Sequence, residues 1–338
     1  MVRKITIILL LLTSSWGLSL YAQDIHFSLF NLNPLTLNPA NTGMMDGDWR
    51  LANSYRTQWR AIGDPLNTFG ASYDQQLYAL PYNLSAGIVF TSDKSGGIEL
   101  TENRILLSAG IKRYFGKHIL SGGLQVGLGS KELNISGITF PEQYSREIGK
   151  FNALLPNGET NLQWNKIYPD VNIGGLFKYS FSRGSWTTGA SVFHVNAPDD
   201  SFYGLGDRLM PRLVWHGETD YAFNERFFIR PSFVWMTLSK AQSLVVNATG
   251  GIQVKDNPLN IERFWTGVGV RTGVNRNGDA FIPFAGLDFK QLRIGVAYDI
   301  NFSGLVQATN RRGALEINLM YIAPSTMINK VTIPCERF

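Results

Sequence analysis

The feature that most constrains this chain is an alternation of apolar and polar residues that recurs in segments of about ten residues. Residues 291–300 place leucine, isoleucine, valine or tyrosine at every second position, with Arg293, Gly295 and Asp299 among the residues between them. Successive side chains of a β-strand point to opposite faces, so this period of two predicts strands with one apolar face. Beyond the first twenty residues, no apolar run reaches the roughly 18 residues that a membrane-spanning helix needs. The pattern therefore favours a β protein over a helical membrane protein.

The composition excludes two other classes of chain. Charged residues make up 17% of the sequence and aromatic residues 12%, whereas disordered chains are rich in charge and poor in aromatics. The single cysteine, Cys335, excludes a small scaffold held together by disulfide bonds. We therefore expect an all-β fold.

Fourteen segments carry the alternating pattern, which predicts an even number of strands. Their expected ranges are 49–59, 67–77, 83–91, 103–115, 118–131, 168–181, 185–195, 208–222, 226–236, 242–254, 260–272, 280–289, 291–300 and 313–321.

The lengths of the predicted connections alternate as well. Connections after even-numbered strands are tight, for example Gly116-Lys117, whereas those after odd-numbered strands are mostly longer, and the longest spans 132–167. An even strand number with short periplasmic turns and long extracellular loops is typical of an outer-membrane barrel. Lipid offers no hydrogen-bond partner to a free sheet edge, so we predict a closed transmembrane antiparallel β-barrel of about 14 strands with both termini periplasmic. A soluble β-sandwich is the alternative, but it does not predict alternating loop lengths.

Aromatic residues gather near the tight turns, as in the interfacial girdle of such barrels. The core of a soluble sandwich is the alternative place for them. They are Tyr114, Phe115, Tyr179, Phe181, Tyr221, Phe223, Phe227 and Phe289.

Residues 1–22 have the layout of a secretory signal peptide. Arg3 and Lys4 precede the apolar stretch 5–12, and small and polar residues follow up to Ala22. A membrane-anchoring helix is the alternative, but the apolar stretch is too short for it. Removal of this segment lowers the formal charge from +5 to +3. The other basic residues form no run of five or more, so we expect no binding of nucleic acid.

Three parts follow the signal peptide. Residues 23–48 precede the first strand, residues 49–321 form the barrel, and residues 322–338 form a tail that we expect in the periplasm. The Asn-Pro pairs that begin at Asn33 and Asn38 are turn signals and predict a plug in the lumen or across the periplasmic mouth. A loose periplasmic leader is the alternative. The candidate periplasmic contacts are Asn33, Asn38, Cys335 and Phe338.

The polar face of the strands predicts a charged lumen. Charges of both signs indicate either a water-filled lumen or paired charges around a plug, and fourteen strands leave room for either. Many glycines fall inside the strands, where they indicate barrel curvature and small lumenal residues. A register slip of one residue would move the charged side chains into lipid. The candidate lumenal polar cluster comprises Arg56, His194, Arg271, Asp299 and Glu316.

No enzymatic or metal-binding motif accompanies this pattern. The four histidines, His26, His118, His194 and His216, show no metal-ligand spacing, and one cysteine cannot build a structural zinc site. The sequence contains no phosphate-loop or nucleophile-elbow motif. Ser191 and His194 are three residues apart, hence on opposite faces of a regular strand. We therefore expect neither an enzyme nor a cofactor.

Short stretches along the mature chain carry a resemblance to a known family. They are Gln23-Asp24-Ile25-His26-Phe27-Ser28, Asn33-Pro34-Leu35, Asn38-Pro39-Ala40-Asn41-Thr42-Gly43, Asn53-Ser54-Tyr55-Arg56-Thr57-Gln58-Trp59, Ser72-Tyr73-Asp74, Pro169-Asp170-Val171-Asn172-Ile173-Gly174, Gly189-Ala190-Ser191-Val192-Phe193-His194-Val195-Asn196-Ala197-Pro198, Ile294-Gly295-Val296-Ala297-Tyr298-Asp299, Ser303-Gly304-Leu305 and Gly313-Ala314-Leu315-Glu316-Ile317-Asn318-Leu319. In this order they resemble the PorP/SprF family of the Bacteroidetes type IX secretion system. No single stretch is decisive, and the specificity lies in their order.

The tail departs from the family pattern at one position. Members of the family end in Cys-Pro-Arg-Phe, whereas this chain ends in Cys335-Glu336-Arg337-Phe338. Phe338 resembles the terminal aromatic residue of a barrel-assembly signal, but Tyr321, at the end of the last predicted strand, suits that role better. Cys335 is either a free thiol or an intermolecular link.

The resemblance implies a non-enzymatic outer-membrane partner of type IX secretion. Such a protein binds the C-terminal domain of a secreted substrate, for example a gliding adhesin, supports its export and anchors it at the cell surface. The expected partners are that domain, translocon or periplasmic components, and outer-membrane lipid. A barrel of this kind offers the domain two docking modes, on the long loops, chiefly 132–167, or inside the lumen. The alternatives are a diffusion channel or small-molecule transporter, and a barrel that only stabilises its neighbours.

Overall fold

The computed structural model describes most of the chain between Ile25 and Thr326. The expectations for the signal peptide, for Cys335 and for Phe338 lie outside the described residues. The described ranges are 25–61, 63–78, 83–95, 100–134, 140–152, 154–156, 164–202, 208–238, 241–254, 260–273, 278–304 and 306–326.

Fourteen antiparallel strands form one closed barrel, in which every strand pairs with its neighbours in sequence and the last pairs with the first. Closure gives each strand two partners and leaves no edge of the sheet free, as lipid requires. The predicted fold is confirmed. The strands are β1 (Trp49–Gln58), β2 (Leu66–Gln76), β3 (Leu84–Ser95), β4 (Leu100–Phe115), β5 (His118–Leu133), β8 (Asn165–Phe181), β9 (Gly184–Phe193), β10 (Arg212–Ala222), β11 (Phe227–Leu238), β12 (Ala241–Gln253), β13 (Ile261–Thr272), β14 (Gly278–Phe289), β15 (Leu292–Asn301) and β16 (Arg312–Ile322).

Two strands deviate from the predicted ranges by four residues: β3 ends four residues later, and β10 begins four residues later than the alternation indicates. Residues before Arg212 are held by the preceding loop instead of a neighbouring strand. The amide of Leu209 donates to the carbonyl of Pro198 over 2.9 Å, and Asp199 and Arg208 form an isolated bridge. The alternation of apolar residues therefore continues through residues 208–211, which pair with the other end of the same loop at Pro198 and Asp199.

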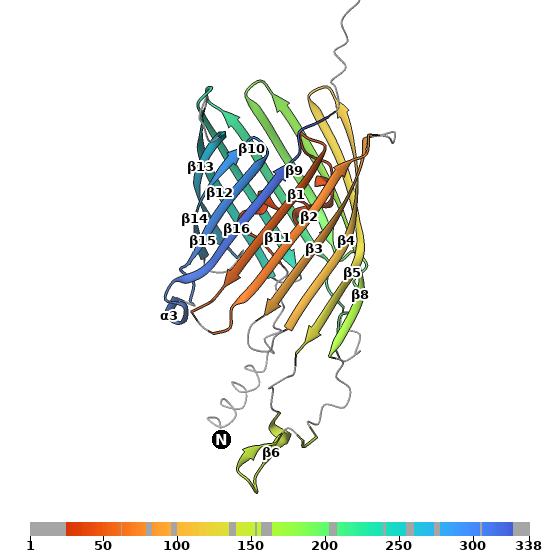
Figure 1. The fold of residues 1–338 in the computed structure, drawn as a ribbon, viewed down its shortest axis with the longest axis vertical. Coiled ribbons are helices and arrows are strands. Elements are labelled where there is room, and N and C mark those ends of the chain that lie inside the picture. Colours follow the sequence, from red (N-terminus) through yellow and green to blue (C-terminus); the bar gives the residue numbers. More distant parts are fainter. Residues whose placement is uncertain are drawn as a thin grey trace, which may run out of the picture.

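The two rims of the barrel differ in their connections. We call the rim with the turns 116–117, 182–183, 223–226 and 290–291 the short-turn end, and the opposite rim the long-loop end. A small sheet, β6 (Tyr144–Ser145) with β7 (Lys150–Phe151), and the helix η4 (Pro141–Gln143) lie beyond the long-loop end, which also carries the short helix α3 (Val306–Thr309) (Figure 1).

The outer face of the barrel is apolar, whereas the inner face carries many polar side chains beside an apolar cluster that includes Phe228, Trp265 and Phe284. Leu107 and Leu128 expose 66% and 58% of their surface on the outside, whereas neighbouring inward residues such as Ser108 and Gln125 are buried. Exposed apolar side chains on a strand that alternates with buried polar ones are what a lipid-facing wall requires. The described residues contain no helix of sufficient length and apolar character to cross a membrane.

Aromatic side chains form a band at the short-turn end. The centroids of Phe181 and Tyr221 lie 6.3 Å apart, and those of Tyr221 and Phe223 lie 5.2 Å apart in an edge-to-face arrangement. Trp49 and Tyr321 extend the band across the pair of first and last strands, with centroids 5.1 Å apart. Amphipathic rings at one rim fit the boundary between hydrocarbon and lipid headgroups.

The described residues before β1 lie inside the barrel, and we call residues 25–48 the lumenal segment. Figure 1 shows its short helices between the walls, and these are η1 (Phe30–Leu32), α2 (Pro34–Leu37) and η2 (Pro39–Asn41). Proline occupies the first position of α2 and of η2, where its missing N–H has no cost. The side chain of Asn38 caps η2 by accepting a hydrogen bond from the amide of Ala40 over 2.8 Å.

The lumenal segment crosses the barrel from one half to the other. Arg212, at the long-loop end of β10, donates to the carbonyl of Ile25 over 3.0 Å. Asp48 reaches the short-turn end, where its amide donates to the carbonyl of Ala323 over 3.1 Å. The described part before β1 therefore begins toward the long-loop end, and the described part after β16 ends at the short-turn end. The expected periplasmic placement of both termini stays a prediction.

Candidate functional site

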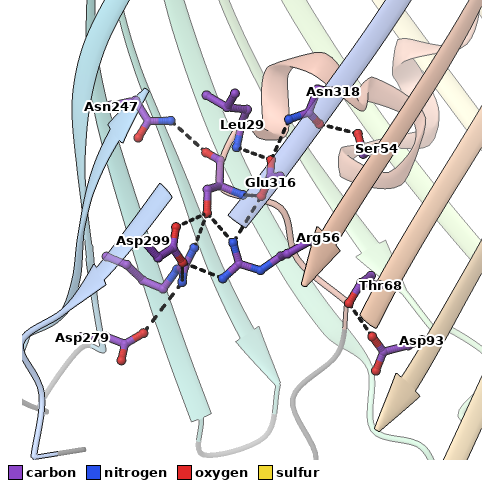
Figure 2. A network of polar contacts seen from close by, with 12 residues as sticks. Leu29, Ser54, Arg56, Thr68, Asp93, Asn247, Asp279, Asp299, Glu316 and Asn318 are labelled. Carbon is purple, nitrogen blue, oxygen red and sulfur yellow. Dashed lines mark hydrogen bonds and ion pairs between the residues drawn. The ribbon is translucent and has the colours of Figure 1, made fainter. Parts of the chain in front are cut away.

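The most extensive buried polar network surrounds Ser28 of the lumenal segment. Glu316 accepts the amide hydrogens of Ser28 and Leu29, with O–N distances of 2.6 and 2.9 Å. The hydroxyl of Ser28 accepts from Arg56 over 2.7 Å and from Arg271 over 2.6 Å. The same hydroxyl donates to Asp299 over 2.9 Å. We call the wall residues Arg56, Arg271, Asp299 and Glu316 the Ser28 clamp, and Figure 2 shows how Arg56, Asp299 and Glu316 converge.

The charges of the Ser28 clamp pair with one another. Arg56 lies 2.6 Å from Asp299 and 3.3 Å from Glu316, and Arg271 lies 2.6 Å from Asp299. Two cations thus balance two anions, although the four side chains are 95% or more removed from solvent. A buried charge is tolerated when it is paired and hydrogen-bonded, and breaking such a group by removing one member costs several kcal/mol.

The register of the barrel brings the Ser28 clamp together. Arg56 of β1 lies opposite Glu316 of β16 in the ladder, so both point inward across the junction of the first and last strands. Arg271 comes from β13 and Asp299 from β15, near the long-loop ends of those strands. Of the five expected lumenal residues, the structure brings these four into contact.

The fifth expected lumenal residue, His194, lies elsewhere in the wall. Its Nδ1 is 2.8 Å from Asp170, and both side chains are fully buried. The amide of His194 donates to the side-chain oxygen of Asn172 over 2.9 Å. Asn172 in turn donates to Gln125, and Gln125 donates to the carbonyl of Leu35 in the lumenal segment. His194 therefore supports a different stretch of the segment from the one held by the Ser28 clamp.

The expected separation of Ser191 and His194 onto opposite faces does not hold. Strand β9 ends at Phe193, and His194 adopts a left-handed backbone with φ of 57°, so both side chains are buried in the interior. Ser191 donates to the carbonyl of Leu37 over 3.1 Å and thereby contacts the lumenal segment. Among the described residues, no group of three or more metal-ligating side chains occurs.

Two residues that the sequence singled out as periplasmic contacts lie in the lumen. Asn33 and Asn38 are 1% and 0% exposed. Asn38 donates to the carbonyls of Gly175 and Ala190 over 3.0 and 3.3 Å. Because both side chains are enclosed by the barrel wall, neither is available at the periplasmic surface in this structure.

A second ion pair holds the lumenal segment near the short-turn end. Asp74 accepts from Arg50 over 2.9 Å and from the amide of Gly43 over 2.7 Å. Arg50 also donates to the carbonyl of Asn41 over 2.9 Å. The alternation places Asp74 on an inward position of its strand, but nothing local to the sequence indicates that its partner is a glycine amide.

The space around the lumenal segment is unequal at its two ends. Toward the short-turn end, cavities of about 270 and 460 Å³ share lining residues such as Lys178, Glu218 and Arg293. Toward the long-loop end, the cavities beside Ile25 and Thr36 measure only about 20 and 30 Å³, which is room for one or two water molecules each. The segment therefore fills the half of the lumen that lies toward the long loops.

A hydrogen-bonded contact fastens the end of the described chain to the short-turn rim. Asp48 accepts from the amide and the hydroxyl of Thr326 over 2.8 and 2.6 Å, and from Tyr78 over 2.8 Å. The bonds from Thr326 lower the pKa of Asp48 to about 2. The group is solvent-exposed, so the contact acts locally on the chain after β16.

We expect a pH dependence of this contact. A lowered pKa in the folded state means that the contact is complete above the ordinary pKa of 3.8 and is lost as the pH falls toward about 2. Hydrogen exchange of the Thr326 amide, corrected for intrinsic rates, should be unchanged from pH 7 to 5 and several-fold faster near pH 2. Asp48→Asn should give fast exchange at neutral pH, whereas Asp46→Asn, an exposed neighbour, should not. Loss of protection already at pH 6 would contradict the assignment.

Comparison with known proteins identifies the family of the chain. Residues 19–321 match the family model described as type IX secretion system membrane protein PorP/SprF. A comparison with curated proteins found no match.

Among solved structures, the chain is similar to several barrels. The CymD monoaromatic hydrocarbon channel is 11% identical, with 88% of this chain and 94% of that chain covered and a TM-score of 0.49. The Ralstonia pickettii toluene transporter TbuX is 10% identical, with 86% and 92% covered and a TM-score of 0.49. A Pseudomonas aeruginosa FadL homologue is 10% identical, with 90% and 95% covered and a TM-score of 0.45.

The family assignment rests on the extent of the match. The matched range begins before the lumenal segment and ends within β16, so it includes the described segment and nearly the whole barrel. A closed barrel with an apolar outer face and an aromatic band is the form in which strands cross an outer membrane. The chain is therefore an outer-membrane β-barrel that belongs to the PorP/SprF family of type IX secretion system membrane proteins.

Proposed function

We propose that this protein binds the C-terminal domain of a secreted type IX substrate, such as a gliding adhesin, supports its export and holds it at the cell surface without enzymatic activity of its own. In this proposal the long-loop end faces outward and the short-turn end faces the periplasm, as in other outer-membrane barrels. Translocon or periplasmic components are the partners on the periplasmic side.

The observation that carries the proposal is an apolar surface on the extension between β5 and β8. Tyr144, Ile148 and Phe151 are about half exposed, and Leu154 is 93% exposed. The rings of Tyr144 and Phe151 pack edge to face with centroids 5.2 Å apart, which gives this surface a defined shape. Exposed apolar side chains on a loop beyond the barrel wall are typical of a protein-binding surface.

The filled lumen supports a binding protein over a diffusion channel. Phe30, Leu32 and Leu35 of the lumenal segment are 5% or less exposed, and only cavities of about 20 and 30 Å³ remain beside the segment toward the long-loop end. We therefore expect the purified protein to show no steady ion conductance in a planar bilayer.

The test is binding of a secreted protein's type IX C-terminal domain to the purified barrel in detergent. Replacing Tyr144, Phe151 and Leu154 together by serine should weaken binding at least tenfold, since buried apolar anchors each contribute more than about 1 kcal/mol. The matched control replaces Val195 and Met210, exposed apolar residues of the loop between β9 and β10, by serine. Its affinity should stay within a few-fold of the wild-type value. Failure of the domain to bind, together with steady conductance of the wild-type barrel, would favour a channel instead.

A further inference from the structure

We infer that the lumen is a binding site for an uncharged polypeptide segment, which residues 25–44 occupy within the same chain and which an equivalent segment of a partner protein takes by exchange. The inference concerns the barrel interior and is independent of the loop surface proposed above. It rests on which atoms of the segment the wall contacts, on the glycines that face it, and on the charges around it.

Many hydrogen bonds from the wall go to main-chain atoms of the segment. Side chains of β1, β2, β4, β5, β9, β10, β12 and β16 contribute, so the contacts follow the segment along most of its length. Main-chain groups are common to all polypeptides, so these bonds recognise the path of a backbone. Packing of Leu29, Phe30 and Leu32 against the apolar cluster of the wall adds a requirement for apolar side chains in a fixed order. The bonds join Arg212 to the carbonyl of Ile25, Glu316 to the amides of Ser28 and Leu29, Asn247 to the carbonyl of Ser28, Gln125 to that of Leu35, Ser191 to that of Leu37, Ser121 to that of Ala40, Arg50 to that of Asn41, and Asp74 and Lys112 to the amide and carbonyl of Gly43.

Glycines on the inner face let the backbone of the segment approach the wall. A Cβ on Gly123 would lie 2.2 Å from the carbonyl of Pro39, and one on Gly110 would lie 2.6 Å from the carbonyl oxygen of Thr42. Both distances are shorter than any real Cβ contact, so only glycine fits. The wall is therefore shaped to a polypeptide main chain at these positions.

The segment has no ionisable side chain other than His26. Residues 25–44 contain no Asp, Glu, Lys or Arg, and the wall's ion pairs Arg56–Asp299, Arg271–Asp299 and Arg50–Asp74 remain intact without it. Departure of the segment therefore separates no buried ion pair. It exposes the hydrogen-bonding groups and the apolar wall residues that the segment covers, so an incoming segment has to replace both kinds of contact. Such a site can exchange its occupant without breaking the barrel.

Space for an incoming segment lies beside the occupant. The cavity of about 270 Å³ is lined by Phe30, Pro34 and Leu37 of the segment, and the adjoining cavity of about 460 Å³ is lined by charged wall residues of the short-turn end. Charged wall residues, among them Lys178, Glu218 and Arg293, line both cavities, so a chain that enters meets polar groups first and apolar side chains only beside the occupant. The exchange partner is accordingly a neutral segment with turn-forming Asn-Pro pairs, entering from the short-turn end.

The experiment uses the full chain with a specific protease site inserted between Met45 and Asp46, where Asp46 is exposed. After folding in detergent, the protein is nicked and mixed with a fluorescent synthetic peptide of residues 25–45. We expect saturable uptake of the peptide by nicked protein and at least tenfold slower uptake by the intact chain. A peptide with N-methyl groups at Ser28 and Leu29, which cannot donate to Glu316, should bind at least tenfold more weakly.

Two results would overturn the inference. The first is a nicked protein that keeps its own segment indefinitely and takes up no labelled peptide. The second is equal binding of a scrambled peptide, which would indicate apolar adsorption. A peptide with Leu32→Met tests the emphasis on main-chain contacts, because it should bind within a few-fold of the native sequence. All of these peptides leave the barrel itself unchanged, so a folding defect cannot imitate the result.

Discussion

Replacing Glu316 by alanine should lower the free energy of unfolding by about 3–5 kcal/mol, the usual cost of removing one member of a buried, paired charge group. The side chain is fully buried and joins Arg56 to the amides of Ser28 and Leu29. Its loss leaves two amide hydrogens without an acceptor and removes one of the two anions that balance the arginines. Reversible urea unfolding in detergent or lipid measures the change.

Two further variants sharpen this result. Glu316→Gln keeps the shape and one acceptor oxygen but removes the charge, so its effect should be smaller, about 1.5–3 kcal/mol. Glu262→Ala removes an exposed acid from β13 and should change stability by no more than about 0.5 kcal/mol. If Glu316→Ala and Glu262→Ala were equally stable, the Ser28 clamp would have no role in holding the segment.

Replacing Gly123 by alanine should wedge the lumenal segment away from the wall. The new methyl group would lie 2.2 Å from the carbonyl carbon and oxygen of Pro39, which are backbone atoms and cannot turn aside as a flexible side chain can. Overpacking of this kind costs about 1–3 kcal/mol of unfolding free energy. Protease digestion of the folded barrel should also cut the segment faster than in the wild type.

The neighbouring glycine provides a matched control. A Cβ on Gly122 would meet only the side chain of Ile111, at an ordinary distance of 3.8 Å. Gly122→Ala changes the same residue type in the same strand but on the outer face, so its stability should stay within about 0.5 kcal/mol of the wild type. Equal destabilisation by both substitutions would assign the effect to the backbone of β5 instead of the lumenal segment.

The barrel was predictable from the sequence because its signal is local. Apolar residues at every second position specify the face of each strand, and tight turns specify the neighbours, so Arg56, Arg271, Asp299 and Glu316 fall on the inner face without knowledge of their partners. The start of β10 was misjudged because Leu209 continues the alternation while its amide bonds to a loop carbonyl. The period of the sequence does not show whether such an amide bonds to a neighbouring strand or to a loop carbonyl.

The lumenal segment was much less predictable. Its helices are three or four residues long, which is too short for a periodic signal, and they persist because wall side chains bond to their main chain. The amide of Ser28 donates to Glu316, which is 288 positions away in the sequence, and no pattern near either residue predicts this hydrogen bond. The side of the sheet on which His194 lies relative to Ser191 was not predictable either, because its left-handed backbone departs from the regular strand that the alternation assumes.

The position of Ser28 between β1 and β16 has a consequence for the assembly of the barrel. Arg56 and Glu316 come from strands that are 260 residues apart in sequence and whose pairing closes the cylinder. Bringing such distant strands together is the slow, entropically costly step in forming a barrel. Ser28 belongs to neither strand but binds both, so it can hold the inner faces of β1 and β16 near one another before the two strands pair. The first and last strands therefore pair around a residue of the N-terminal segment, which implies that this segment is in place before the barrel closes.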